Sequence, residues 1–183
     1  DGWPIALLLI ASVLEHDPTL DPSAMSGQSP NIERFFTETL LARLPAADAD
    51  LLVSASILDA LHPELLRAMT GSNDIAALLA RLAASTPILA IGEGSAWLRM
   101  HPLARHALGR LFAAFPPARQ RELHWRAAQW LHEFGDAEAA ARHALAAERQ
   151  EVACEWIGHH LHELAMASRR GEVLRWAERL PPD

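Results

Sequence analysis

The sequence contains no lysine, because all 16 basic residues among its 183 are arginines. A complete phosphate-binding loop of the G-x-x-x-x-G-K-[ST] type therefore cannot be formed by this chain, since that loop needs its lysine to reach the phosphates. A lysine Schiff base and a phosphate-binding lysine of the kinase type are excluded for the same reason. The absence of lysine thus removes several large classes of enzyme.

Cysteine and tyrosine are also scarce, with one Cys and no Tyr. The single cysteine, Cys154, excludes an internal disulfide and any cysteine-rich zinc site, and it fits a reducing compartment. In contrast, the chain has 35 Ala and 29 Leu, which are strong helix formers and poor markers of strands. The composition therefore predicts a mainly α fold.

Charge is distributed unevenly along the chain, whose formal net charge is −7. Residues 1–100 carry 12 acidic residues and 5 arginines, whereas residues 101–183 carry 11 of each. Neither part has the basic excess of an autonomous nucleic-acid-binding domain. The longest apolar run, residues 5–11, is too short to span a bilayer and has no basic region before it. We therefore expect a cytoplasmic protein with no membrane partner.

Local signals in residues 32–115 predict short helices followed by one β-hairpin. Pro63 is typical of a helix start and Gly71 of a helix end, and Ser72 or Asn73 is suited to cap the next helix. Two apolar runs, residues 87–91 and 96–100, flank the turn sequence GEGS and predict strands of about five residues. Helices followed by such a hairpin indicate a winged-helix domain, which continues into a helix that starts at His101.

The remaining residues, 119–183, predict a helical solenoid. Apolar residues repeat at helical spacing in four segments, and the turn glycines Gly135 and Gly171 are 36 residues apart. Two helices in each 34–40 residues is about the period of TPR-like repeats. Two repeats are few for a stable array, and the chain begins at Asp1 without Met. We therefore expect it to be part of a longer protein.

Few residues carry a signal for catalysis. His159, His160 and His162 cluster in one segment and leave open a metal-dependent enzyme, but solvated histidines on a helix face are the more ordinary interpretation. The solenoid tryptophans are expected to pack between helices or to line a groove. We assign no catalytic residue and no metal ligand.

Two short motifs are more informative in combination than alone. Gly2-Trp3-Pro4 stands at the start of the chain, and His101-Pro102-Leu103 follows the predicted hairpin. A proline in the first helical turn is common, and a histidine at a helix start is often a cap or a core residue.

The order of these features resembles that of the MalT-type large ATP-binding regulators of the LuxR family, which are signal-transducing STAND ATPases. The segments that carry the resemblance occur in the family's order: GWPIALLLIA, FFTETLLARLP, LLVSASILDALHPELLRAMTG, DIAALLARL, WLRMHPLARHAL and RELHWRAAQWLHEFGDAEAAARHALAA. The third segment is the most distinctive.

The resemblance implies four regions. Residues 1–15 would end the helical lid of the ATPase module, and residues 16–31 are a linker specific to this chain. Residues 32–115 would form the winged-helix domain, and residues 119–183 the start of the TPR-like superhelical sensor. The phosphate-binding loop and the C-terminal DNA-binding helix-turn-helix of the family would lie outside this chain.

The resemblance also implies roles for the two motifs. Pro4 would pack against adenine, and His101 would reach the β-phosphate of bound ADP, where a helix start favours an anion.

The chain would then be a non-catalytic regulatory part of a transcriptional activator. Full-length protein would bind ATP or ADP, but no cofactor is expected on the isolated chain. Its partners would be the other domains of the same protein and an unknown effector, with DNA bound only through the missing domain. The alternative is a TPR-like helical module for protein–protein interaction.

Overall fold

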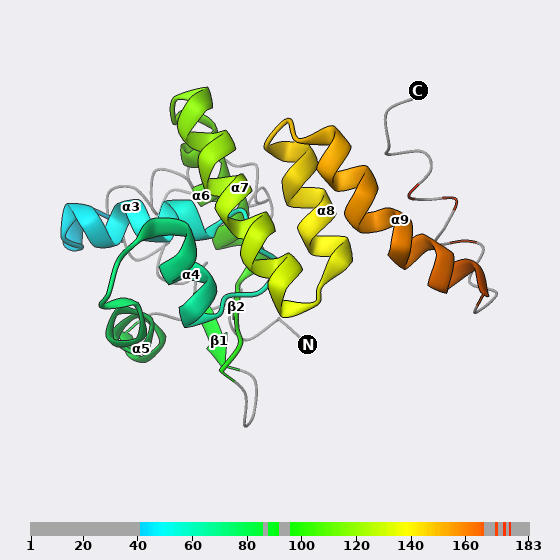
Figure 1. Ribbon diagram of the computed structural model, residues 1–183. Coiled ribbons are helices and arrows are strands. Elements are labelled where there is room, and N and C mark those ends of the chain that lie inside the picture. Colours follow the sequence, from blue (N-terminus) through cyan, green and yellow to red (C-terminus); the bar gives the residue numbers. More distant parts are fainter. Residues whose placement is uncertain are drawn as a thin grey trace, which may run out of the picture. The chain divides into compact units, whose positions relative to one another are not determined.

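The computed structural model describes residues 41–85, 88–91 and 96–166, and single residues near the C-terminus (Gly171, Leu174 and Trp176). The chain divides into two compact units, an N-terminal unit, Asp1–Phe115, and a C-terminal unit, Pro116–Asp183. Both consist mainly of helices (Figure 1). The expected mainly α fold, with a winged-helix arrangement and a helical solenoid, is confirmed.

In the described part of the N-terminal unit, a short 3-10 helix and three α-helices precede a small hairpin, and one α-helix follows it. In chain order its described elements are η3 (Leu41–Arg43), α3 (Ala46–Ala55), α4 (Pro63–Thr70), α5 (Ile75–Ser85), β1 (Leu89–Ile91), β2 (Leu98–Met100) and α6 (Pro102–Ala113).

The helix ends follow from local chemistry. Pro63 occupies the first turn of α4, and Gly71 ends that helix in the left-handed region with φ of 75°. The apolar spacing in residues 46–58 predicts a helix over that range. Helix α3 ends three residues earlier, at Ala55, because the Ser56 hydroxyl donates to the Val53 carbonyl at 2.7 Å and closes the last turn. The first bond of α5 runs from the Leu78 N–H to the Asp74 carbonyl, so α5 begins after Asp74 rather than directly after the expected caps, Ser72 or Asn73.

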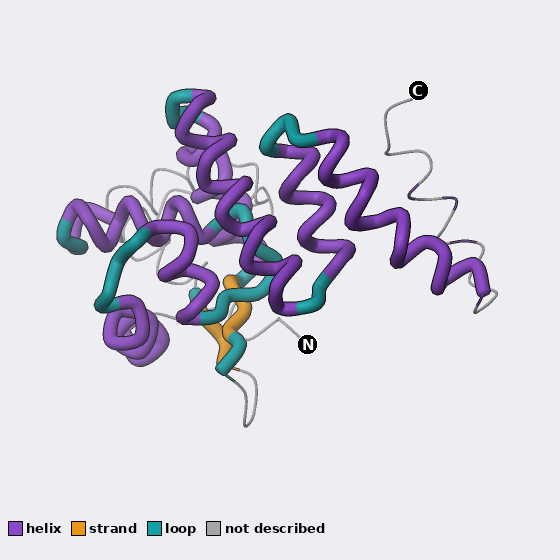
Figure 2. The backbone as a smooth tube through the Cα atoms, in the orientation of Figure 1, coloured by secondary structure: helices purple, strands orange, loops and turns teal. Residues whose placement is uncertain are grey.

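The hairpin is confirmed, with strands of three residues instead of about five. Strands β1 and β2 pair in antiparallel fashion, with Ala90 opposite Arg99 (Figure 2, orange). On its other side β2 forms a bridge to Leu61, where each residue's N–H donates to the other's carbonyl at 2.8 and 2.9 Å. This third, minimal strand ties the loop before α4 to the hairpin.

In the described part of the N-terminal unit, the core is made mainly of aliphatic side chains from α3, α4, α5 and α6. The apolar residues of α5 recur at helical spacing, and this stripe is fully packed, since Ile75, Leu78, Leu79 and Leu82 are each at most 2% exposed. Largely buried residues of the other elements complete this core: Leu52, Leu58, Leu61, Leu65, Leu66, Met69, Ile88 and Leu108.

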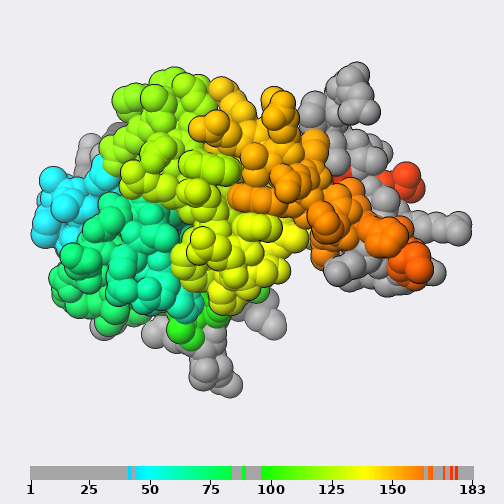
Figure 3. Space-filling model, in the orientation of Figure 1, coloured from blue at the N-terminus to red at the C-terminus, as the bar shows by residue number. Residues whose placement is uncertain are grey.

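The C-terminal unit contains α7 (Pro117–Phe134), α8 (Ala137–Ala146) and α9 (Gln150–Met166). Short turns join them, so successive helices reverse direction and pack side by side, α7 on α8 and α8 on α9 (Figure 1). The adjoining surfaces of α8 and α9 are visible in Figure 3 in yellow and orange. Gly135 takes a φ of 96° at the end of α7, and the Asp136 side chain caps α8.

Alanines fill the centre of the C-terminal unit, which lets its helices approach closely. One cluster combines Ala128, Ala141, Ala144 and Ala153 with Ile157 and Trp176. The apolar spacing of residues 123–134 predicts that Phe134 belongs to one stripe of α7, but its side chain is 55% exposed. It lies on the last turn of α7 and stacks on the ring of Trp130 instead.

Several expectations fall outside the described residues: the lid segment 1–15, the linker 16–31, and the fourth solenoid helix apart from its single residues. The helical spacing of Phe36, Leu40, Leu41 and Leu44 also predicts a helix, and most of it lies outside the described residues. Among the helices that the structure does describe, none has the length and apolar character that a membrane crossing requires.

Candidate functional site

The candidate site is centred on His101, which lies between β2 and α6. Its backbone N–H donates to the Ile88 carbonyl at 2.7 Å, which anchors it to the residue preceding β1. Its carbonyl accepts from the Arg105 N–H at 2.9 Å and so begins α6. The sheet and the helix therefore fix the backbone of His101 from both sides.

The side chain of His101 caps α6. Its Nδ1 accepts a hydrogen bond from the Leu103 N–H at 3.3 Å, and Pro102 occupies the first helical turn. A ring nitrogen that accepts carries no proton, so this bond selects the neutral tautomer with its proton on Nε2. Nε2–H is then the ring's donor.

The end of α6 also suits an anion for an electrostatic reason. The first turn of this 12-residue helix contains no acidic residue of its own, and the nearby Asp59 carboxylate is paired with Arg105 of the same helix, so the positive end of the dipole is favourable for an anion. His101 is half-buried there. The local capping role, one of the two interpretations of this histidine, is therefore present, and its phosphate-binding role stays a prediction.

Pro4 lies outside the residues that the structure describes. The assignment of Pro4 to adenine also stays a prediction.

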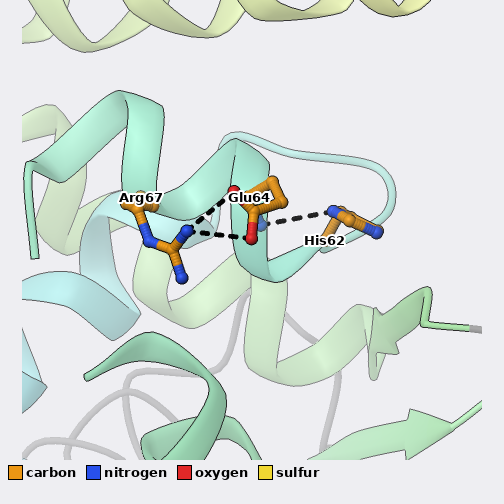
Figure 4. Close-up of polar contacts among 3 residues, drawn as sticks. All are labelled: His62, Glu64 and Arg67. Atoms are coloured by element: carbon orange, nitrogen blue, oxygen red, sulfur yellow. Dashed lines mark hydrogen bonds and ion pairs between the residues drawn. The ribbon is translucent and has the colours of Figure 1, made fainter. Parts of the chain in front are cut away.

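A second histidine cap, which sequence reasoning missed, lies at the start of α4. The Nδ1 of His62 accepts from the Glu64 N–H at 3.2 Å, and Pro63 follows it as Pro102 follows His101 (Figure 4). The shared dipeptide His-Pro was the signal that could have revealed it. Its ring also lies against Trp97, with centroids 5.0 Å apart.

The two caps differ in the charge around them. Glu64 occupies the first turn of α4 and forms an ion pair with Arg67 at 2.8 Å (Figure 4). A carboxylate therefore already offsets the dipole at the His62 cap and would repel an added anion. The first turn of α6, unlike that of α4, contains no acidic residue, which makes His62 a natural internal control for His101.

The histidines of α9 do not converge. His159 Nδ1 lies 3.3 Å from the Glu155 carbonyl of its own helix, whereas His160 Nε2 lies 3.4 Å from the Glu138 carboxylate of α8. Within the described residues no three His, Cys, Asp or Glu side chains are placed to hold a metal ion. The geometry gives no support to a metal-dependent enzyme based on His159, His160 and His162.

The tryptophans of the C-terminal unit are divided between the two expected roles. Trp176 is buried in the alanine-rich core. Trp125 of α7 stacks on Trp156 of α9 with parallel rings at 5.8 Å, and His132 stacks on Trp156 at 4.1 Å. These rings are part-buried or exposed, so they form an aromatic surface as well as a packing contact.

Comparison with known proteins supports one part of this picture. Residues 36–120, somewhat less than half of the chain, match the family model of the MalT winged helix domain. No curated protein matches the chain. The chain therefore contains a MalT-like winged-helix domain, and His101 lies within the matched residues.

Proposed function

We propose that this chain is a non-catalytic regulatory part of an ATP-dependent transcriptional regulator of the LuxR family. In this proposal it couples the nucleotide state to effector sensing and self-association. The match of residues 36–120 to the MalT winged helix domain carries the proposal. The acid-free helix start at His101 supports it.

The proposed device is a contact between His101 and the phosphates of ADP held by a nucleotide domain of the same protein. With Nδ1 bonded to the Leu103 N–H, Nε2–H donates to a phosphate oxygen. The contact would hold the winged helix in the resting state. Exchange of ADP for ATP, together with binding of an effector to the superhelix, would release the contact. DNA would be bound through a separate helix-turn-helix domain.

The test compares His101→Ala with His62→Ala in the full-length protein. Both substitutions remove the same kind of cap, which costs about 1 kcal/mol of stability. Only His101→Ala should also accelerate ADP release, by about tenfold for the loss of one charge-assisted hydrogen bond, and raise basal activation. Release of a fluorescent ADP analogue and transcription from a target promoter measure the two effects.

The result that contradicts the proposal is equal behaviour of the two variants. If ADP release and basal activity are the same in both, His101 is a structural cap like His62.

The alternative function is a helical module for protein–protein interaction, and the aromatic surface of Trp125, Trp156 and His132 favours it. The two functions predict different neighbouring sequence. A phosphate-binding loop encoded upstream of Asp1 is expected only for the nucleotide-dependent regulator, and its absence from the full gene would favour the interaction module.

A further inference from the structure

A cavity in the C-terminal unit has features of a ligand site that the nucleotide-dependent switch does not use. Its volume is about 320 Å³, within the range of small-molecule sites. One wall is the start of α7 and the other is the turn between α8 and α9. Seven residues line it: Ala118, Arg121, Glu122, Trp125, Ala147, Glu148 and Arg149.

The turn that forms one wall has an unusual residue at its centre. The Arg149 N–H donates to the Ala144 carbonyl and the Glu148 N–H to the Leu145 carbonyl, both at 2.9 Å, which is the Schellman arrangement of a helix end. Its central residue has a φ of 59° and is usually glycine, as at Gly71 and Gly135, but here it is Glu148. A side chain at this position is conformationally costly, so its presence points to a use.

Glu148 uses its side chain to hold Arg121 across the cavity. The Arg121 guanidinium donates to the Glu148 carboxylate at 3.2 Å, so the turn and α7 are joined by an ion pair. Glu122, the other acidic residue of the lining, accepts from Arg126 at 2.7 Å. Each carboxylate of the cavity therefore has its own arginine.

Arg149 is the remaining charged residue of the cavity lining. Its guanidinium lies over the Trp125 ring, 5.4 Å from the centroid, and forms no ion pair or hydrogen bond in the part of the chain that the structure describes. A guanidinium that stacks on an indole keeps its N–H groups at its edge, where they match a carboxylate in bidentate fashion. The lining thus combines one uncompensated positive charge with an aromatic face.

We propose that this cavity binds a small ligand with a single carboxylate on an aromatic or flat apolar body. The carboxylate binds the edge of Arg149, and the body lies beside the Arg149–Trp125 stack, against Ala118 and Ala147. Glu122 and Glu148 flank the site, so a singly charged group is favoured over a phosphate dianion. The inference does not rest on the nucleotide-dependent switch, because the cavity lies wholly within the C-terminal unit and binding is measured without nucleotide.

The experiment uses the complete 183-residue chain and 3-phenylpropionate as the probe. Titration is followed by the indole N–H signals in ¹H–¹⁵N NMR spectra, and Trp125→Leu identifies the signal of Trp125. Arg149→Gln should weaken binding at least about tenfold, since it removes both the positive charge and the paired N–H groups that bind a carboxylate in bidentate fashion. Arg149→Lys, which keeps the charge, should fall between Arg149→Gln and the natural protein.

Matched controls make the result specific. Arg142→Gln removes an exposed arginine of α8 that does not line the cavity and should leave binding unchanged. The neutral 3-phenylpropionamide should not bind. Equal binding of the amide, tighter binding of phenyl phosphate, unchanged binding in Arg149→Gln, or no shift of the Trp125 signal with 3-phenylpropionate would each overturn the proposal.

Discussion

Replacing Ile157 with alanine should lower the free energy of unfolding of the C-terminal unit by about 4 kcal/mol, the upper part of the range for such truncations. The Ile157 side chain is fully buried in the cluster of Ala128, Ala144 and Ala153. Most of its buried neighbours are alanines, which have no flexible side chain to move into the lost space, and the larger side chains packed against the cluster, such as Leu145 and Leu161, are only partly buried. The cavity therefore closes mainly through shifts of the helix backbones, which is why the cost is high.

Urea unfolding followed by tryptophan fluorescence measures this effect. Four of the six tryptophans lie in residues 116–183, so the signal reports mainly on the C-terminal unit. Ile157→Val should cost about 1 kcal/mol. Met166→Ala is the control on the same helix, and its effect should be below about 0.5 kcal/mol because that side chain is 77% exposed. Similar losses for Ile157→Ala and Met166→Ala would show that the alanine-rich cluster is not the stabilising core.

The sequence predicts best those features that depend on neighbouring residues. Pro63 and Gly71 predict both ends of α4, because proline suits a first turn and glycine a left-handed helix end. The hairpin was also predicted, although each strand is shorter than its apolar run. The mainly α class followed from the abundance of alanine and leucine.

Features that depend on how helices cross were not predictable in this way. Glu148 occupies a left-handed position without the glycine that would signal a turn, and its reason is an ion pair with Arg121, 27 residues earlier. The exposure of Phe134 shows a related limit of prediction from apolar spacing. A residue on the last turn of a helix can lie past the end of the helix that packs against it and so remain exposed. At the candidate site, the sequence predicted His101, but only the structure shows that His62 is the same kind of cap.

A part-buried pair of histidines joins α7 to α8, and it was not visible in the sequence because 19 residues separate its members. The Nδ1 atoms of His124 and His143 lie 2.9 Å apart, so one must donate and the other accept. His143 is only 8% exposed. Burial lowers the pKa of His124 from 6.5 to about 4, because desolvation disfavours the charged imidazolium.

This lowered pKa makes the C-terminal unit sensitive to acid. Between pH 6.5 and about 4 the unfolded chain binds a proton at His124 that the folded chain does not, so the free energy of unfolding falls as pH is lowered through this window. A shift of this size corresponds to roughly 3 kcal/mol, which is fully present above pH 6.5. Below about pH 4 both states are protonated at this site, and His124 causes no further loss.

The prediction is tested with His124→Asn, which keeps a polar group near His143 but does not titrate. Urea unfolding of this variant and of the natural protein is measured from pH 7.5 to 4, and the stability of the natural protein should fall by roughly 3 kcal/mol more than that of the variant. Titration of the carboxylates affects both proteins alike and cancels in the difference. The control is His162→Asn, at an exposed position of α9, which should keep the acid sensitivity of the natural protein. Parallel stability curves for the natural protein and His124→Asn would show instead that protonation of the His124–His143 pair costs the folded state no stability.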